Sequence, residues 1–135
     1  MMEKDYEGIV IKMIEAFNRK DIDSWMDYFT DYADVVGPDG VRMDKKGLRD
    51  YYAGIFTAFP DGRFGVERMI SKGSTVVVEI FGRGTHEGEY FGVPATNKRI
   101  ELPMVFIMDF EDGMVKRWRG YYYWQKFVSQ ILEIQ

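Results

Sequence analysis

Cysteine is absent from this sequence, and His86 is its single histidine. The lack of cysteine excludes disulfide bonds and thiol catalysis. It also excludes zinc sites built from clusters of cysteine and histidine. The remaining metal-binding side chains are carboxylates, which are dispersed along the chain rather than spaced as a ligand motif. We therefore expect neither a metal nor an organic cofactor in the functional site.

Long apolar runs are missing as well. The longest, residues 102–108, contains Pro103 and is far too short to cross a bilayer. The first ten residues carry charges from the outset and lack the apolar stretch of a signal peptide. A formal net charge of −4 makes the chain a poor binder of nucleic acid or of an anionic membrane surface. These features predict a cytoplasmic protein with neither nucleic-acid nor membrane partners.

Aromatic residues, in contrast, are abundant, at 16% of the 135 residues. One domain is the ordinary expectation at this length, and no repeat or break in composition argues for a second. We therefore assign residues 1–135 to a single domain. With this composition, the core or a cavity within it is expected to be lined by rings.

The first half of the chain has the apolar spacing of helices. Three segments have this spacing. Asp21 or Asp23 is expected to cap the second segment, and Asp44 is expected to cap the third. Pro60 and Gly62 end the third segment. Between the second and third, a turn rich in glycine and proline predicts a short hairpin that closes near Met43. The three helical segments are residues 3–18, 21–29 and 45–59.

The second half has the character of strands, with a tight turn at Glu111-Asp112-Gly113 and one long connection at residues 87–98. The chain ends in a short helix or a strand tail around Phe127. Helices first and antiparallel strands later are typical of an α+β domain. The simplest packing lays the helices across one face of a strongly curved sheet, which leaves a cone-shaped space for a small molecule. The four predicted strands are residues 64–70, 74–83, 99–110 and 114–124.

Three short motifs carry a resemblance to a known family. Gly-Thr-His-Glu-Gly at 84–88, Gly-Val-Pro-Ala-Thr at 92–96 and Ala-Phe-Pro-Asp at 58–61 occur in this chain, followed by the Asp112-Gly113 turn. In this order they resemble the SnoaL-like polyketide cyclases, within the nuclear-transport-factor-like and ketosteroid-isomerase-like superfamily. The resemblance implies a cone-shaped α+β barrel. The superfamily contains isomerases, dehydratases, epoxide hydrolases, cyclases and binding proteins, so activity has to be argued from the site.

The resemblance also locates two positions that matter for cyclase chemistry. Related cyclases place an acid/base Asp eleven residues after the turn Asp, and here that residue is Tyr123. They often place a His six residues before the turn Asp, and here that residue is Phe106. Tyrosine, with an ordinary pKa near 10, is a poor base at rest, and phenylalanine cannot transfer a proton.

Strand alternation extends this assignment to neighbouring residues. If Tyr123 faces the pocket, Tyr121 and Arg119 face it too. If Phe106 faces the pocket, so do the alternate residues Leu102, Met104 and Met108. A bulge near Gly120 would shift the register of the last strand.

The candidate catalytic residues are His86 and Tyr123 as an acid/base pair, with Arg119 donating hydrogen bonds to a carbonyl or enolate oxygen. Each candidate has a structural alternative: aromatic side chains pack cores, arginines occupy solvated sheet ends, and His86 can hold the start of the long connection. The candidate substrate contacts are Tyr121, Phe106, Met104, Met108, Trp25, Tyr28 and Phe56.

Three functions compete on this basis. The first is a cofactor-free cyclase, isomerase, lyase or hydrolase acting on an apolar polyketide, terpenoid or steroid-like molecule with a carbonyl or hydroxyl group. The second is a binding protein that holds such a ligand without turnover, which the tyrosine and phenylalanine at the two cyclase positions favour. The third is a protein-interaction role on the outer sheet surface, as in transport factors.

The last strands also predict a homodimer. Apolar residues stand at consecutive positions in 105–108 and 121–124, so both faces of the sheet carry them. One face fills the cone, and the other requires a cover. Relatives of this fold commonly pair through this sheet, so we expect the cover to be a second copy of the chain.

Overall fold

The computed structural model describes residues 5–132. Helices come first and strands dominate the second half, so the predicted α+β class is confirmed. The helices are α1 (Tyr6–Asn18), α2 (Ile22–Asp27), α3 (Lys45–Ala58) and α4 (Trp124–Leu132). The strands are β1 (Phe29–Val36), β2 (Arg42–Met43), β3 (Arg63–Lys72), β4 (Thr75–Thr85), β5 (Arg99–Glu111) and β6 (Met114–Tyr122).

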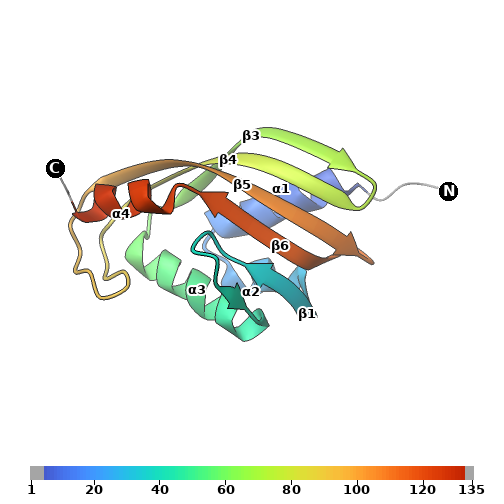
Figure 1. The fold of residues 1–135 in the computed structure, drawn as a ribbon, viewed down its shortest axis with the longest axis horizontal. Coiled ribbons are helices and arrows are strands. Elements are labelled where there is room, and N and C mark those ends of the chain that lie inside the picture. Colours follow the sequence, from blue (N-terminus) through green and yellow to red (C-terminus); the bar gives the residue numbers. More distant parts are fainter. Residues whose placement is uncertain (1–4, 133–135) are drawn as a thin grey trace.

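The strands of the described residues form one six-stranded sheet in the order β2-β1-β6-β5-β4-β3. The sheet is mixed, because β1 runs parallel to β6 while every other pair is antiparallel. It is strongly curved but does not close, since β2 and β3 remain its edges. Figure 1 shows α1, α2 and α3 together on one side of the sheet, with α4 at one end of the long strands. This is the expected arrangement of helices on a curved sheet.

Aspartate side chains begin the first three helices. Asp5, Asp21 and Asp44 each accept a hydrogen bond from the backbone N–H three residues later. Such caps satisfy an N–H group that has no partner inside the helix. The predicted cap of α3 at Asp44 is confirmed, and of the two candidates for α2 the structure uses Asp21.

The core lies between the helices and the concave face of the sheet. Phe17 of α1 stacks on Phe64 of β3, with ring centroids 3.6 Å apart and planes 5° apart. Trp25 of α2 packs against Phe17 and against Tyr52 of α3. Contacts of this kind fix the three helices over the sheet, because aromatic rings bury large areas and pack in specific geometries.

A β-bulge divides β6 into two parts. Next to the turn, Val115 pairs with Phe110, but the next pair is Arg117 with Asp109, so Lys116 is an extra residue. Continued without interruption from the turn, the register would pair Phe106 with Arg119; the bulge pairs Phe106 with Gly120 instead. A shift of one residue moves every later side chain to the opposite face.

This bulge overturns the orientation predicted for β6. Directly paired residues point to the same face, and Met104 and Met108 pair with Tyr122 and Trp118. Trp118 and Tyr122 therefore face the concave side, whereas Tyr121 faces away from it. On β5 the prediction is confirmed, because Leu102, Met104, Phe106 and Met108 are all buried.

The end of β6 also differs from the prediction. The strand stops at Tyr122, and helix α4 begins at Trp124 instead of continuing the strand. The expected turn before β6 is confirmed: Asp112 and Gly113 have φ angles of 52° and 81°, the left-handed pair of a tight hairpin. No helix within residues 5–132 is long and apolar enough to span a membrane.

Candidate functional site

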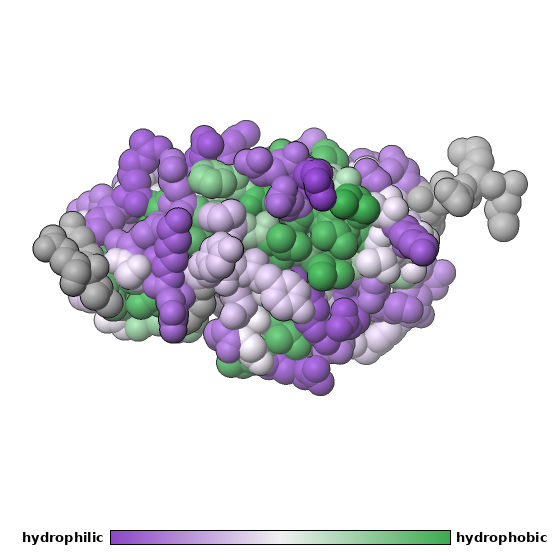
Figure 2. All heavy atoms as spheres, turned by 45° about the horizontal axis from the view of Figure 1, so that its top comes forward, coloured by the Kyte–Doolittle hydropathy of each residue, from purple (hydrophilic) through white to green (hydrophobic). Residues whose placement is uncertain are grey.

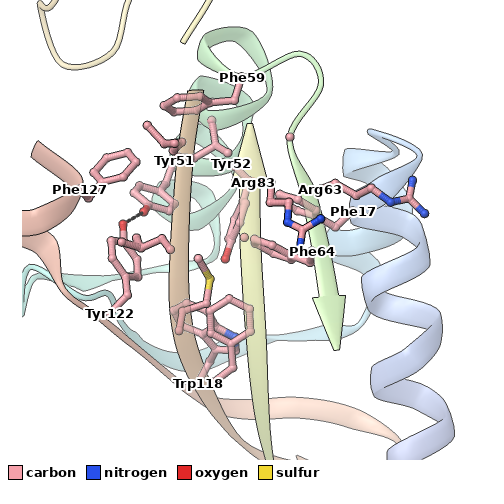
Figure 3. A pocket seen from close by; sticks show the side chains of 17 residues that line it. Phe17, Tyr51, Tyr52, Phe59, Arg63, Phe64, Arg83, Trp118, Tyr122 and Phe127 are labelled. Carbon is pink, nitrogen blue, oxygen red and sulfur yellow. Dashed lines mark hydrogen bonds between the residues drawn. The ribbon is translucent and has the colours of Figure 1, made fainter. Parts of the chain in front are cut away.

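An apolar cavity of about 70 Å³ lies between the helices and the concave face of the sheet. Figure 3 shows its walls, which come from α1, α3, the sheet and α4. Aliphatic and aromatic side chains form most of the surface, and Met104 adds an adaptable thioether chain. The walls include Phe17, Phe64, Leu102, Met104, Phe106 and Trp118.

The cavity contains no carboxylate, imidazole or ammonium group from any described residue. Arg63 and Arg83 reach its rim, but both are exposed, and the Arg83 guanidinium lies 5.0 Å from the centre of the Phe81 ring. Within the walls, the oxygen-bearing side chains are those of Tyr51, Tyr52 and Tyr122. The interior chemistry is therefore that of phenols.

Two of these phenols meet at one end of the cavity. The hydroxyl groups of Tyr51 on α3 and Tyr122 on β6 lie 3.0 Å apart, as the dashed line in Figure 3 marks. Burial raises the pKa of Tyr51 and, more strongly, that of Tyr122. Burial also raises the pKa of Tyr52 well above its ordinary value. All three side chains are neutral hydrogen-bond donors at physiological pH.

Tyr90 brings a third hydroxyl group to this pair. It lies in the long connection between β4 and β5, and its residue is buried. Burial raises the pKa of Tyr90, and the neighbouring Tyr51 adds to the shift. Its hydroxyl interacts with those of Tyr51 and Tyr122 but completes no hydrogen bond of standard geometry with a described residue. Three phenols from three separate segments therefore converge here.

Helix α4 covers this end of the cavity. Phe127 packs its ring against Phe59 and Tyr90, with centroids 5.9 and 5.3 Å away. The Gln130 side chain fixes the helix to β5: its Oε1 accepts from the Glu101 N–H at 3.1 Å, and its Nε2 donates to the Glu101 carbonyl at 3.2 Å. The cavity wall is thus closed by rings, and the helix is fastened by the Gln130 amide and by the Lys98 ammonium, which donates to the Ile131 carbonyl at 3.4 Å.

His86 lies outside the cavity lining. It is fully buried, its Nδ1 lies 2.9 Å from the Thr96 hydroxyl, and burial lowers its pKa, so the ring is neutral. Its backbone pairs with Lys98 and Asn97 across the base of the long connection. His86 therefore holds the start of the long connection, as in its structural alternative, and does not lie beside Tyr123.

The other residues of the family motifs fasten the same region. Thr85 donates from its N–H and its hydroxyl to the Asp61 carboxylate, both at 2.7 Å. Gly88 donates its N–H to the Ala58 carbonyl, and a Cβ at Gly88 would lie 2.4 Å from the Thr57 carbonyl oxygen. Only glycine fits that approach, so the motifs join the end of α3 to the end of β4.

Arg119 points to the convex side of the sheet, contrary to the prediction. Its guanidinium donates to the Asp34 carboxylate at 3.0 Å and to the Asp34 carbonyl at 2.9 Å. Hydrogen bonding from Arg119 lowers the pKa of Asp34. Arg119 is 8% exposed and holds β1 beside β6, so it is an ion-pair partner and no donor to the cavity.

Tyr121 and Tyr123 do not line the cavity either. Tyr121 is 53% exposed on the convex face, and Tyr123, just beyond the end of β6, is 68% exposed. The expected inward orientation of both is wrong, because the bulge at Lys116 reverses the faces of the strand. Tyr122, between them, is the residue that faces inward.

The predicted substrate contacts divide into two groups. Met104 and Phe106 line the cavity. Trp25 and Met108 are buried in the core, while Tyr28 and Phe56 are partly buried and pack against that core without reaching the lining. Phe56, for example, packs on Phe17 at 5.1 Å.

Sequence reasoning missed the residues that make the cavity polar at one end. Tyr51 and Tyr52 lie within the third predicted helical segment, and Tyr122 lies within the last predicted strand. The available signal was the hairpin itself, because pairing β6 against a correctly oriented β5 fixes which tyrosine points inward. Reading that signal required the position of the bulge.

The described residues contain no group of three or more histidine, cysteine, aspartate or glutamate side chains that could hold a metal ion. An apolar cavity under helices on a curved, open sheet is the arrangement of the cone-shaped α+β fold. The sequence itself gives the narrower assignment. Residues 8–131 match the family model of the SnoaL-like polyketide cyclases, and the chain belongs to that family.

Solved structures share the fold. AclR from Streptomyces galilaeus, provisionally called a hydroxylase, is 20% identical with a TM-score of 0.88, over 96% of this chain and 82% of that one. A protein of Jannaschia sp. CCS1, provisionally a SnoaL-like polyketide cyclase, is 18% identical with a TM-score of 0.87, over 100% and 99% of the two chains. IdmH from Streptomyces antibioticus, provisionally a polyketide cyclase, is 22% identical with a TM-score of 0.83, over 97% and 100%. No curated protein matches the sequence.

Proposed function

We propose that the cavity binds a small apolar molecule, such as a polyketide, terpenoid or steroid-like compound, and that the protein converts it without a cofactor by cyclase- or isomerase-type chemistry. One observation carries the proposal: the walls are mostly apolar, and at one end the Tyr51 and Tyr122 hydroxyls lie 3.0 Å apart. Such a cavity orients a ligand whose carbonyl or hydroxyl oxygen meets the phenols while its carbon skeleton packs against the rings.

The phenols suit one part of such a reaction. A neutral phenol donates a hydrogen bond to a carbonyl oxygen, which polarises the carbonyl and stabilises charge that develops on that oxygen. An apolar cavity also holds a flexible substrate in a compact conformation, which brings two reacting carbons of one chain together. Carbonyl polarisation and proximity are therefore the contributions that this lining can make to ring closure or isomerisation.

A second candidate is a binding protein without turnover. The observation in its favour is that the lining offers no carboxylate and no imidazole from the described residues to remove a proton. Proton abstraction next to a carbonyl requires a base with a pKa near the working pH. A buried phenol with a raised pKa does not meet that requirement.

The two candidates are separated by measuring binding and turnover together. Thioesters of linear poly-β-keto acids are incubated with the protein, cyclised products are followed by mass spectrometry, and binding is followed by quenching of tryptophan fluorescence. For an enzyme, Tyr122→Phe is expected to lower turnover by about 10²-fold, the effect of losing one transition-state donor. Tyr123→Phe is the matched control, since that hydroxyl is outside the cavity. Binding without product supports the binding protein, and the absence of both contradicts the proposal.

We also propose that two copies of the chain pair through the convex face of the sheet. Ile70 and Tyr121 are exposed on that face, and Val77, Val105 and Ile107 are half-buried there. Figure 2 shows apolar side chains gathered in the middle of this side, with hydrophilic side chains around them. A second copy would cover this patch.

Light scattering at micromolar concentration tests the pairing. The wild type is expected to have the mass of a dimer, and Ile107→Glu, which places a charge in the centre of the patch, is expected to give a monomer. Glu79→Gln, on the same face, is the control. A monomeric wild type would rule this interface out.

A further inference from the structure

We propose that a surface depression between α3 and the connection after β4 binds a small organic ammonium ion. The depression has a volume of about 220 Å³ and is separate from the cavity described above. Tyr51 and Ile55 line both spaces, so these two side chains form a shared wall. The ammonium site goes beyond the proposed function and does not depend on what occupies the cavity.

Two segments of the chain form the depression. Figure 1 shows the connection between β4 and β5 next to the end of α3. The N–H groups of Glu87 and Gly88 donate to the Ala58 carbonyl at 2.9 and 3.1 Å, which attaches the connection to the helix. Side chains of the connection therefore lie beside those of α3. The lining residues outside the shared wall are Asp50, Gly54, Glu89, Tyr90 and Phe91.

The charged groups of the lining are all negative. They are the carboxylates of Asp50 and Glu89, and no lysine, arginine or histidine of the described residues joins them. Neither carboxylate forms an ion pair or a hydrogen bond with another described residue. Besides burial, the carboxylate of Asp39 raises the pKa of both Tyr51 and Tyr90, so a third negative group lies nearby. Carboxylates gathered without a counter-charge attract a cation.

Aromatic rings favour an organic cation over a metal ion. Tyr90 and Phe91 pack edge to face, with ring centroids 4.6 Å apart and planes 73° apart. The face of such a ring attracts an ammonium group placed within about 6 Å of its centre. A metal ion requires several oxygen ligands in one shell, and residues 5–132 contain no group of three or more side chains that could supply them. Rings beside carboxylates suit an alkylammonium group, whose carbon atoms contact the rings.

The backbone places Phe91 here in an unfavourable conformation. Phe91 and Gly92 have φ angles of 46° and 78° and are the central residues of a tight turn, closed by two hydrogen bonds between Tyr90 and Val93. Turns with left-handed φ angles at both central positions favour Asn, Asp and Gly, and a bulky side chain is strained there. Phe91 gains little burial in return, since it is 72% exposed. Contact of its ring with a ligand would account for a strained aromatic residue at the surface.

Gly54 keeps the floor of the depression open. It lies within α3, where glycine is the least favourable residue after proline. A Cβ at Gly54 would meet no atom within 4 Å, so no packing contact requires a glycine at this position. The missing side chain instead leaves space beside Asp50 and Phe91, which the ammonium group would occupy.

Choline and 3,3-dimethyl-1-butanol test the site. The two compounds have the same shape, but the alcohol carries a carbon atom in place of the charged nitrogen. Nuclear magnetic resonance titration, followed at the backbone amides of Phe91 and Gly92, locates the binding and measures both affinities. The wild-type protein is expected to bind choline at least about 10-fold more tightly than the alcohol, because only choline interacts with the rings and carboxylates through its charge.

Three variants remove one contribution each. Phe91→Leu keeps an apolar side chain without an aromatic face, and we expect about 3- to 10-fold weaker binding of choline. Asp50→Asn removes one negative charge, and we expect binding about 2- to 5-fold weaker. Gly54→Leu fills the floor of the depression and is expected to abolish measurable binding. Circular dichroism checks that each variant is folded.

Glu67→Gln is the matched control for the loss of one negative charge. Glu67 is exposed on β3 and does not line the depression. The control is expected to bind choline as tightly as the wild type, because the change in net charge is the same as in Asp50→Asn but lies elsewhere.

Several outcomes would overturn the ammonium site. Equal affinities for choline and the alcohol would show that charge plays no part. Equal losses in Asp50→Asn and Glu67→Gln would show attraction by the net charge of the protein alone. Undiminished binding in folded Gly54→Leu would place choline elsewhere, and the absence of choline binding would reject the site directly. Each of these results leaves the proposed function untouched, because choline does not probe the apolar cavity.

Discussion

The two faces of β6 use similar residues for opposite purposes. On the concave face Trp118 and Tyr122 line the cavity, whereas on the convex face Arg119 binds β1 and Tyr121 lies exposed. Tyrosines occupy both faces, so residue type does not decide the role. The face is decided by the single extra residue at the bulge. The number of residues between the turn and a position in the strand therefore decides which face its side chain occupies, and the residue type alone does not.

Deletion of Gly120 is expected to have the largest effect on the difference between the two faces of β6. The deletion would move Tyr121 to the concave face, in the position where a Cβ would lie 2.4 Å from the Trp118 ring. We expect a loss of more than about 5 kcal/mol, comparable to the whole free energy of folding of a small domain.

Deletion of Lys116 is the matched control for this experiment. It removes the bulge residue and leaves the pairs from Arg117 onward in place, so the loss is expected to stay below about 2 kcal/mol. Circular dichroism and urea unfolding measure both proteins. A folded Gly120 deletion together with an unfolded Lys116 deletion would contradict the assigned register.

Trp118→Ala tests the concave face alone. The side chain is fully buried and packs on Phe106 at 4.8 Å, so we expect a loss of about 3–5 kcal/mol from the lost packing and the cavity left behind. Arg117→Ala, one residue earlier and exposed, is expected to stay within about 0.5 kcal/mol. Equal effects in urea unfolding would show that the two side chains do not differ in burial.

Asp34→Asn tests the convex face, where a charge is nearly buried. Asp34 is the hydrogen-bonding partner of Arg119 and is itself partly exposed, so we expect a loss of about 1–2 kcal/mol at neutral pH. Because Arg119 lowers the pKa of Asp34 in the folded protein, this stability is present at neutral pH. It is lost as the pH falls through the lowered pKa.

Unfolding in urea from pH 7 down to pH 3 checks this prediction. The difference between wild type and Asp34→Asn is expected to shrink as the pH falls, since protonated Asp34 resembles the amide. A difference that stays constant over the range would exclude Asp34 as its source.

Tyr122→Phe and Tyr121→Phe give the smallest and sharpest contrast. Removal of the Tyr122 hydroxyl takes away the oxygen that lies 3.0 Å from the buried Tyr51 hydroxyl, and the expected loss is about 1 kcal/mol. Removal of the Tyr121 hydroxyl is expected to change the unfolding free energy by less than about 0.5 kcal/mol, because that ring is 53% exposed. Thermal unfolding of the two variants tests this prediction. A larger loss of stability for Tyr121→Phe than for Tyr122→Phe would contradict the assigned orientations of the two side chains.

The sequence predicted the α+β class, the helices, the first hairpin and the faces of β5, because each rests on local periodicity or capping. Asp44 and the Asp112-Gly113 turn are examples that act within a few residues. The cavity-facing side of β6 could not be predicted in the same way. The bulge at Lys116 has no distinctive residue type, and its effect depends on pairing with a second strand.

The candidate site was predicted in part for the same reason. Met104 and Phe106 were placed correctly on the cavity wall, since unbroken alternation connects them. Tyr51 and Tyr90 come from segments far apart in the chain, and only the folded structure brings their hydroxyls toward Tyr122. Counting from the turn to Tyr123 pointed one residue beyond the inward-facing phenol, because the bulge at Lys116 shifts every later residue by one position.

The attachment of α4 to the sheet includes two contacts that carry no charge. Gln130 meets the Glu101 backbone with an uncharged amide, and Phe127 closes the wall through ring contacts. Neither interaction changes with salt concentration or protonation across the physiological range. Cosolutes that compete for amide groups, such as urea, would loosen this end of the molecule before acid or salt does. These two contacts are accordingly expected to tolerate wide changes of buffer while responding early to mild denaturant.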